Sequence, residues 1–203
     1  MWLGKGRTRG FDREVALEVA MQLFWRRGFV GTSVADLCTA MGITSPSMYA
    51  AFGNKEALYQ ASLEHFSKTR GLPIWLKVME AKTARETVET LFTCTVNAYT
   101  DHNQPLGCMS TLAIVTQDES PKLAELVKAG RESTYQMLNE KFQAAVAAGE
   151  FRPDTDVASL ARVYLTMLQG ISIQARDGAS RDALLAMVTA MMAGWNAITQ
   201  QGD

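Results

Sequence analysis

Residues 45–52 form a short run of small and polar side chains that are suited to binding another molecule through hydrogen bonds and apolar contacts. The hydroxyls of Ser45, Ser47 and Tyr49 can hydrogen-bond to phosphate oxygens or to base edges. Pro46 and Ala50 can make only apolar contact, for instance with a thymine methyl group. Small side chains would let a helix backbone sit deep in a groove, and the major groove of DNA admits one α-helix. We therefore expect this run to read double-stranded DNA.

Further candidate DNA contacts surround this run. Some hydroxyl residues fall at expected helix starts, where backbone N–H groups are free for phosphate, and a basic arm precedes them. No Arg, Asn or Gln lies between residues 43 and 53, so the best bidentate base readers are missing. We infer a specificity that depends on the arm, on apolar contacts and on DNA shape. The candidates are Thr32, Ser33 and Thr44 at helix starts and Lys5, Arg7 and Arg9 in the arm.

The cysteines offer a second kind of chemistry. Cys108 follows Gly107 close to an expected helix start, where the helix dipole favours a thiolate, so it is a candidate sensor of electrophiles or oxidants. Cys94 and His102 lie nearby in sequence, and a soft metal such as Cu(I) is conceivable, although the spacing matches no tight metal motif. A buried, unreactive cysteine is the alternative.

Residues for covalent catalysis are sparse. The only histidines are His65 and His102, and the chain has no nucleophile motif, no phosphate-binding loop and no helical metal box. We therefore expect no enzyme activity, no cofactor and no metal site.

Composition and charge indicate a globular chain with a basic front. Apolar residues make up 47% of the 203 residues and charged residues 20%, and no apolar run approaches the roughly 18 residues of a membrane span. The odd number of widely spaced cysteines and the absence of an apolar stretch after the N-terminal charges favour a cytoplasmic protein with no membrane partner. Residues 1–55 hold seven basic and four acidic side chains, whereas the remainder holds thirteen and seventeen. This asymmetry is typical of a polyanion partner at the front, although it can also arise by chance.

Helical periodicity runs through the whole chain, and no segment alternates long enough for a sheet. We expect helices over 12–27, 33–41 and 45–52, capped by Thr32 or Ser33 and by Ser45, and a fourth from Asn54 to about residue 70. The pair joined by "GIT" has the helix-turn-helix spacing. A bend is expected at "GLPIWL", followed by helices over 84–100, 106–117, 121–149, 156–176 and 180–199.

The expected architecture is all-α with two domains. Residues 1–55 would form a helix-turn-helix DNA-binding domain, and residues 56–203 a larger ligand-binding and dimerisation domain, joined by the connecting helix 54–70. Apolar residues of the last two helices are predicted to form a homodimer interface, with intramolecular core as the alternative. These are Leu160, Tyr164, Met167, Ile171, Leu184, Met187, Met191, Trp195 and Ile198.

An effector pocket is expected among the helices of residues 84–176, although each candidate is also suited to plain core. The many Met and aromatic side chains favour a small apolar or aromatic effector. The candidates are Phe92, Val96, Tyr99, Cys108, Met109, Leu112, Ile114, Tyr135, Leu138, Phe142, Tyr164 and Gln169.

The N-terminal segment also resembles the DNA-binding domain of TetR-family transcriptional regulators. The resemblance is carried by "GTSVADL", the Gly42–Ile43 turn, "SPSMY" and "FGNKEAL". It implies DNA contacts by Thr32, Ser33, Thr44, Ser45, Ser47, Tyr49 and Lys55, and dimerisation through the last two helices. The sequence departs from the family at Ser45, where Lys is common, and at Ala50, where His or an aromatic is frequent. The expected function is a ligand-responsive regulator, most simply a repressor that binds a palindromic operator as a dimer and is released by a small molecule. The alternatives are a helical small-molecule-binding protein or a thiol or metal sensor acting through Cys108.

Overall fold

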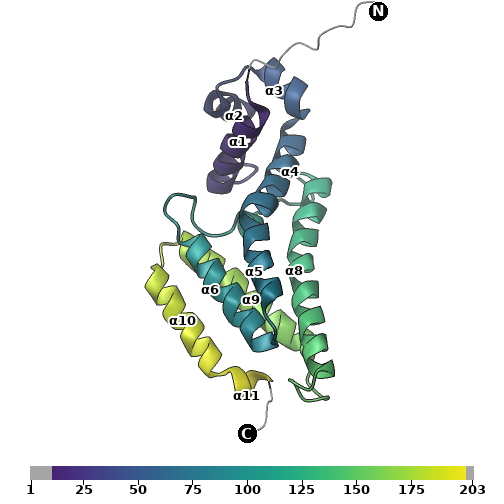
Figure 1. Cartoon of the computed structure of the whole chain (residues 1–203). Coiled ribbons are helices and arrows are strands. Elements are labelled where there is room, and N and C mark those ends of the chain that lie inside the picture. The colour runs from purple at the N-terminus through teal and green to yellow at the C-terminus, as the bar shows by residue number, and fades with distance from the viewer. Residues whose placement is uncertain (1–10, 200–203) are drawn as a thin grey trace, which may run out of the picture.

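The computed structural model describes residues 11–199, apart from the side chain of Ile198, and these residues form helices and turns with no strand. Three helices make a head at one end, and α4 (Lys55–Phe66) leads from it into a bundle of further helices (Figure 1). No helix of the described residues is long and apolar enough to cross a membrane. The predicted all-α class is confirmed.

In the head, the predicted caps at Gly28, Ser33 and Gly42 are confirmed, whereas Asp12, expected in the first helical turn, is itself an N-cap. Helix α1 (Arg13–Arg27) begins at the N-cap Asp12, and α2 (Val34–Met41) begins at Ser33 and ends at Gly42, whose φ of 64° is left-handed. The prediction that Ser45 caps α3 (Ser45–Phe52) is wrong by one residue. The hydroxyl of Thr44 accepts from the Ser47 N–H, so Ser45 is the first helical residue.

The connection between head and bundle differs from the expected bend. Helix α4 (Lys55–Phe66) starts at the N-cap Asn54 as predicted, then passes through a π-helical turn (Ser67–Gly71) directly into α5 (Leu72–Glu80). Pro73 is tolerated because it lies in the first turn of α5, where an N–H has no helical partner to lose. One nearly continuous rod therefore joins the two parts.

The bundle is made by α6 (Ala84–Tyr99), α8 (Pro121–Ala147), α9 (Val157–Arg176) and α10 (Arg181–Ala193), together with α5. The helix predicted over 106–117 is instead the single turn α7 (Met109–Leu112). The last predicted helix breaks at Gly194, and α11 (Trp195–Thr199) follows.

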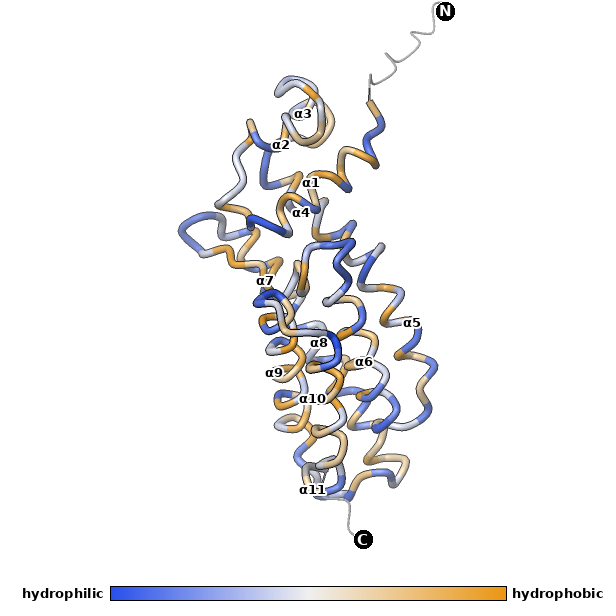
Figure 2. Tube along the Cα trace, turned by 90° about the vertical axis from the view of Figure 1, so that its left-hand side faces the viewer, coloured by the Kyte–Doolittle hydropathy of each residue, from blue (hydrophilic) through white to orange (hydrophobic). Residues whose placement is uncertain are grey.

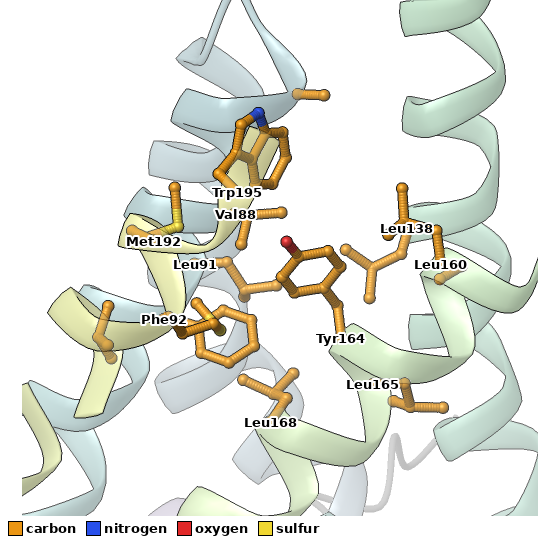
Figure 3. Packing of buried hydrophobic residues seen from close by; sticks show 14 of the residues in the cluster. Val88, Leu91, Phe92, Leu138, Leu160, Tyr164, Leu165, Leu168, Met192 and Trp195 are labelled. Carbon is orange, nitrogen blue, oxygen red and sulfur yellow. The ribbon is translucent and has the colours of Figure 1, made fainter. Parts of the chain in front are cut away.

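Two apolar cores hold the chain together. One fills the bundle, where the Tyr164 ring lies near Phe92 and Trp195 (Figure 3). The Phe142 ring also packs against Tyr164. The other fills the head and also takes in Met109 and Leu123, from α7 and α8. The head is therefore packed directly onto the bundle.

Most of the residues predicted for the dimer interface lie inside the bundle core. Six of them are buried inside a single chain, as Figure 3 shows for Leu160, Tyr164 and Trp195. They are Leu160, Tyr164, Ile171, Leu184, Met191 and Trp195. Met167 and Met187 are half-buried, and the Ile198 side chain is outside the described part. The apolar stripe of each helix faces the bundle core, so the alternative of intramolecular core is correct for these six residues.

Candidate DNA-binding surface and effector cavity

Helix α3 presents a small, polar face at the tip of the head. Met48 and Phe52 are buried and fix the helix against α1 and α2, as the four-residue spacing predicts. The opposite side leaves Ser45, Pro46 and Ala50 exposed, and the Tyr49 side chain is 49% exposed. This face has no bulky side chain except Tyr49.

The other polar candidates of the head differ in the exposure and hydrogen bonding of their hydroxyl groups. Thr44 is exposed, and its Oγ1 lies 3.0 Å from the Oγ of the half-buried Ser47. The Ser33 hydroxyl donates to Asp36 Oδ2 at 2.6 Å and accepts from the Asp36 N–H, so it closes a capping box. Thr32 is fully buried, and its hydroxyl donates to the Gly28 carbonyl oxygen at 2.8 Å. Its side chain therefore does not lie on the exposed surface.

Among residues 11–199, Lys55 and Arg13 supply positive charge near α3. The Lys55 ammonium lies over the Phe29 ring, 4.3 Å from its centroid. Burial lowers the pKa of Lys55, and the charge of Glu119 opposes that shift. The sequence reasoning missed Arg13, whose Nε donates to the Ala51 carbonyl oxygen at 3.4 Å. Lys5, Arg7 and Arg9 of the predicted arm lie outside the described residues.

A cavity of about 1250 Å³ opens inside the bundle. Its wall is built by α5, α6, α8 and α9, with the π-turn and α7 at the end nearest the head. Trp25, a residue of the head, also lines it. The volume exceeds the 300–1,000 Å³ typical of small-molecule sites.

Three of the predicted pocket residues line this cavity, namely Tyr99, Cys108 and Gln169. Five others are buried in the bundle core, because the interior of a helix bundle and the wall of its cavity are equally apolar in sequence. These are Phe92, Val96, Leu138, Phe142 and Tyr164. Met109, Leu112 and Ile114 border a smaller hollow of about 340 Å³ beneath the head. The ring of Tyr135 stacks under Arg162.

The cavity residues of α8 that the sequence analysis did not name follow a helical spacing that could have identified them. Gly130, Ser133, Thr134, Met137 and Lys141 recur every three or four residues and line the cavity together. A helical face of small residues leaves room for a ligand, and a Cβ added at Gly130 would meet open space. The cavity residues Trp25, Phe66 and Arg70 have no such signal, because they belong to α1, to the end of α4 and to the π-turn.

Polar contacts link the cavity wall to the head. Arg70, which lines the cavity, donates to Glu18 of α1 at 2.6 Å and to Gln104 at 3.1 Å. His65 Nε2 lies 2.9 Å from the other Glu18 oxygen. Burial raises the pKa of Glu18, but hydrogen bonds from Gln22 and His65 and the charge of Arg70 outweigh it and leave the pKa below its usual value.

A second arginine makes a parallel connection. Arg176, at the end of α9, donates to the Leu106 carbonyl oxygen at 2.9 Å and to the Trp25 carbonyl oxygen at 3.0 Å. Leu106 and Gln104 belong to the same loop between α6 and α7, and both arginines reach α1. Helix α1 is thus tied to a loop that borders the cavity.

Two thiols face the cavity. Cys94 and Cys108 both line it, together with Tyr99. Burial, and then the neighbouring Cys108, raise the pKa of the Tyr99 phenol well above its usual value. Among the described residues no three or more His, Cys, Asp or Glu side chains gather as metal ligands. Cys94 and His102 therefore do not belong to any such cluster, and the Cu(I) site considered from the sequence is not supported.

The head and the bundle both match one family of known proteins. Residues 16–62 match the pattern described as "Bacterial regulatory proteins, tetR family", and residues 84–191 match "Tetracyclin repressor-like, C-terminal domain". The chain belongs to the TetR family of helix-turn-helix transcriptional regulators, which confirms the resemblance seen in the sequence and the expectation of a regulator in place of an enzyme.

Individual relatives cover nearly the whole chain. It is 32% identical to the HTH-type transcriptional repressor ComR of Escherichia coli K12 (94% of this chain, 92% of ComR) and 28% identical to the repressor BdcR of the same organism (93% and 90%). A structure of the TetR-family regulator CifR, a cysteine-substituted variant complexed with 26-bp double-strand operator DNA, is 38% identical and superposes with a TM-score of 0.88 (94% of this chain, 100% of that chain).

Proposed function

We propose that this protein is a dimeric transcriptional repressor that binds a palindromic operator and releases it when a small molecule fills the bundle cavity. The observation that carries the proposal is the link between the two sites: Arg70 lines the cavity and pairs with Glu18 of the head at 2.6 Å. Repressor relatives and the CifR complex with operator DNA support the direction of regulation and the partner.

Operator reading is assigned to the exposed side of α3. Small residues allow close approach to the major groove, while hydroxyls such as those of Thr44 and Tyr49 are placed for phosphates or base edges. The exposed Pro46 and Ala50 suit apolar contact with thymine methyl groups. The basic arm would add sequence-independent attraction and minor-groove contacts.

The dimer is assigned to the outward sides of α9 and α10, which a second copy would cover. Val163 and Ile173 are 40% and 52% exposed on α9. The exposed side of α10, which faces the viewer in Figure 2, consists mainly of alanines. These are Ala183, Ala186, Ala190 and Ala193. Two-fold pairing there would place two reading heads at half-sites about 34 Å apart.

Ligand binding would act through the loop between α6 and α7. A molecule in the cavity displaces Arg70 or Gln104, which changes the contacts of α1 and therefore the angle of the head. In a dimer a small change in that angle alters the separation of the two heads, so that both half-sites cannot be held together. The π-turn Ser67–Gly71 is the natural point of flexure, since its hydrogen bonds depart from those of the flanking helices.

The test is an electrophoretic mobility shift with DNA upstream of the protein's own gene, at stated salt. We expect a sequence-specific shift by the native protein, a loss of affinity for Tyr49→Ala, and a smaller loss for Tyr49→Phe, which keeps the ring. Size-exclusion chromatography should show unchanged dimers for both variants. Absence of a specific shift at any neighbouring promoter would favour a helical ligand-binding protein without a DNA function.

Thiol sensing is a second candidate, favoured by the two cysteines that face one cavity. In that case N-ethylmaleimide would release the operator from the native protein and leave Cys108→Ser bound. Equal release of both proteins, or of neither, would exclude a sensor that acts through Cys108.

A further inference from the structure

The effector cavity has a charge opposite to that of its domain. Residues 56–203 carry thirteen basic and seventeen acidic side chains, yet the cavity is lined by four cations and one carboxylate, that of Asp101. The cations are Arg70, Lys77, Arg131 and Lys141. A cluster of cations within an acidic domain favours an anionic ligand.

Within the part of the chain that the structure describes, only one of these cations forms an ion pair. Arg70 is paired with Glu18. The only hydrogen bond of the Arg131 guanidinium within the described residues is a donation to the Ala113 carbonyl oxygen at 3.1 Å, and no carboxylate pairs with it. Lys77 and Lys141 likewise form no ion pair within residues 11–199. A half-buried guanidinium without a carboxylate retains most of its donors for a ligand.

A second unpaired donor belongs to a residue that lines the same cavity. The indole Nε1 of Trp25 is buried without a hydrogen-bond partner among the described residues, and Trp25 lines both this cavity and the smaller hollow beneath the head. Arg131 donates to the carbonyl of Ala113, and Ala113 packs with Trp25 in the core of the head. Arg131 and Trp25 therefore both lie at the end of the cavity nearest the head. A buried N–H without an acceptor costs free energy that an anionic oxygen of a ligand would recover.

The middle of the cavity is apolar. Trp75, Leu91, Met137, Leu165 and Leu168 contribute to its wall. On α8, Arg131 and Lys141 are ten residues apart, about 15 Å along the helix axis. The space between them suits a hydrocarbon chain or a fused-ring body.

From these observations we infer that the effector is an amphipathic anion, with a carboxylate or phosphate held by Arg131 and the Trp25 indole and an apolar body running along α8. Lys77 and Lys141 attract the ligand at the other end of the cavity. This inference rests on the proposed function, since it names the class of molecule that releases the operator, and it refines the expectation of a purely apolar or aromatic effector.

A matched pair of fluorescent probes tests the inference without DNA. 1-Anilinonaphthalene-8-sulfonate is an anion, and N-phenyl-1-naphthylamine has the same rings without the sulfonate. We expect the native protein to bind the anion more tightly, and Arg131→Gln to weaken that binding about tenfold or more while binding of the neutral probe is unchanged. Lys141→Gln should weaken anion binding less. The control Lys122→Gln, on an exposed part of α8 away from the cavity, removes the same charge and should change neither probe.

Competition then identifies the head group of the ligand. Dodecanoate or dodecyl phosphate should displace the anionic probe, whereas 1-dodecanol at the same concentration should not, and the tighter of the two competitors distinguishes carboxylate from phosphate. Equal binding of the two probes by the native protein, or equal losses in Arg131→Gln and Lys122→Gln, would overturn the inference. Unchanged binding of the neutral probe shows that Arg131→Gln is folded. If the probe experiments fail but the protein still gives a sequence-specific mobility shift with its operator, only the ligand class is refuted. If the protein binds the anionic probe but gives no mobility shift with any operator, the proposed function is refuted.

Discussion

The hydroxyl of Thr32 lies two residues before α2, yet it points into the protein and donates to the Gly28 carbonyl oxygen. Gly28 ends α1, so this bond closes the turn between the first two helices. Ser33, the next residue, closes a capping box with Asp36. At the residue scale, neighbouring hydroxyls with the same sequence context therefore have different tasks: Thr32 is structural, whereas Thr44 is exposed.

Thr32→Val should destabilise the protein with little effect on operator affinity. Valine keeps the volume but leaves the Gly28 carbonyl oxygen without its donor, at a cost of about 1 kcal/mol in the free energy of unfolding. The measurement is urea unfolding. Thr69→Val is a matched control, because Thr69 also donates to the carbonyl four residues before it but is exposed; we expect a change below about 0.5 kcal/mol there. A large loss of operator affinity at unchanged stability would mean that Thr32 acts at the DNA.

Local sequence patterns predicted which residues of α3 are buried, but they did not predict which residues line the cavity. Met48 and Phe52 could be placed inward because their spacing leaves one apolar side on a short polar helix. In the bundle, Leu138 and Met137 are adjacent and both apolar, yet one is core and the other lines the cavity. Which of two such residues faces a void depends on how four helices pack, and no single helix encodes that.

At the scale of elements, the rod formed by α4, the π-turn and α5 determines how the head meets the bundle. Caps made its beginning predictable, since Asn54 precedes α4 and its side chain accepts from the Ala57 N–H. The π-turn was not predictable from the sequence. A proline such as Pro73 usually indicates the end of a helix, and only the structure shows that it lies in the first turn of α5. Arg70 lies in this turn, where its guanidinium reaches both α1 and the loop between α6 and α7.

Arg70→Gln should reduce stability more than the loss of an exposed ion pair. Its bonds to Glu18 and Gln104 join separate elements and are half-buried, so their removal should cost about 1–2 kcal/mol in the free energy of unfolding. Arg152→Gln is the control, since that arginine pairs with Asp154 in solvent and its loss should cost less than about 0.5 kcal/mol. Differential scanning calorimetry provides the comparison, and equal effects of the two variants would argue against Arg70 as a connection between head and bundle.

At the scale of the whole molecule, the proposed function requires a dimer, which we assign to the outward sides of α9 and α10. A single head offers only α3 as a reading element, and its small side chains supply few strong contacts. Affinity for an operator then depends on holding two half-sites at once. The sequence predicted an interface formed by the apolar stripes of α9 and α10. We propose the outward sides of these helices instead, because six of the predicted residues are buried in the core of one chain and the outward side of α10 is mainly alanine.

Ala190→Arg should separate dimerisation from folding. Ala190 is exposed at the middle of the alanine side of α10, so a single chain has room for the arginine, whereas a second copy packed on that side would meet a bulky charge. We expect a folded monomer by size-exclusion chromatography with light scattering, and operator affinity lower by about a hundredfold or more because the two heads are no longer linked. Ala144→Arg makes the same change at an exposed site on α8 and should leave the dimer and the affinity intact. If Ala190→Arg stays dimeric and binds the operator normally, the two-fold axis lies on another surface; if the native protein is itself a monomer with full affinity, the paired-head mechanism is wrong.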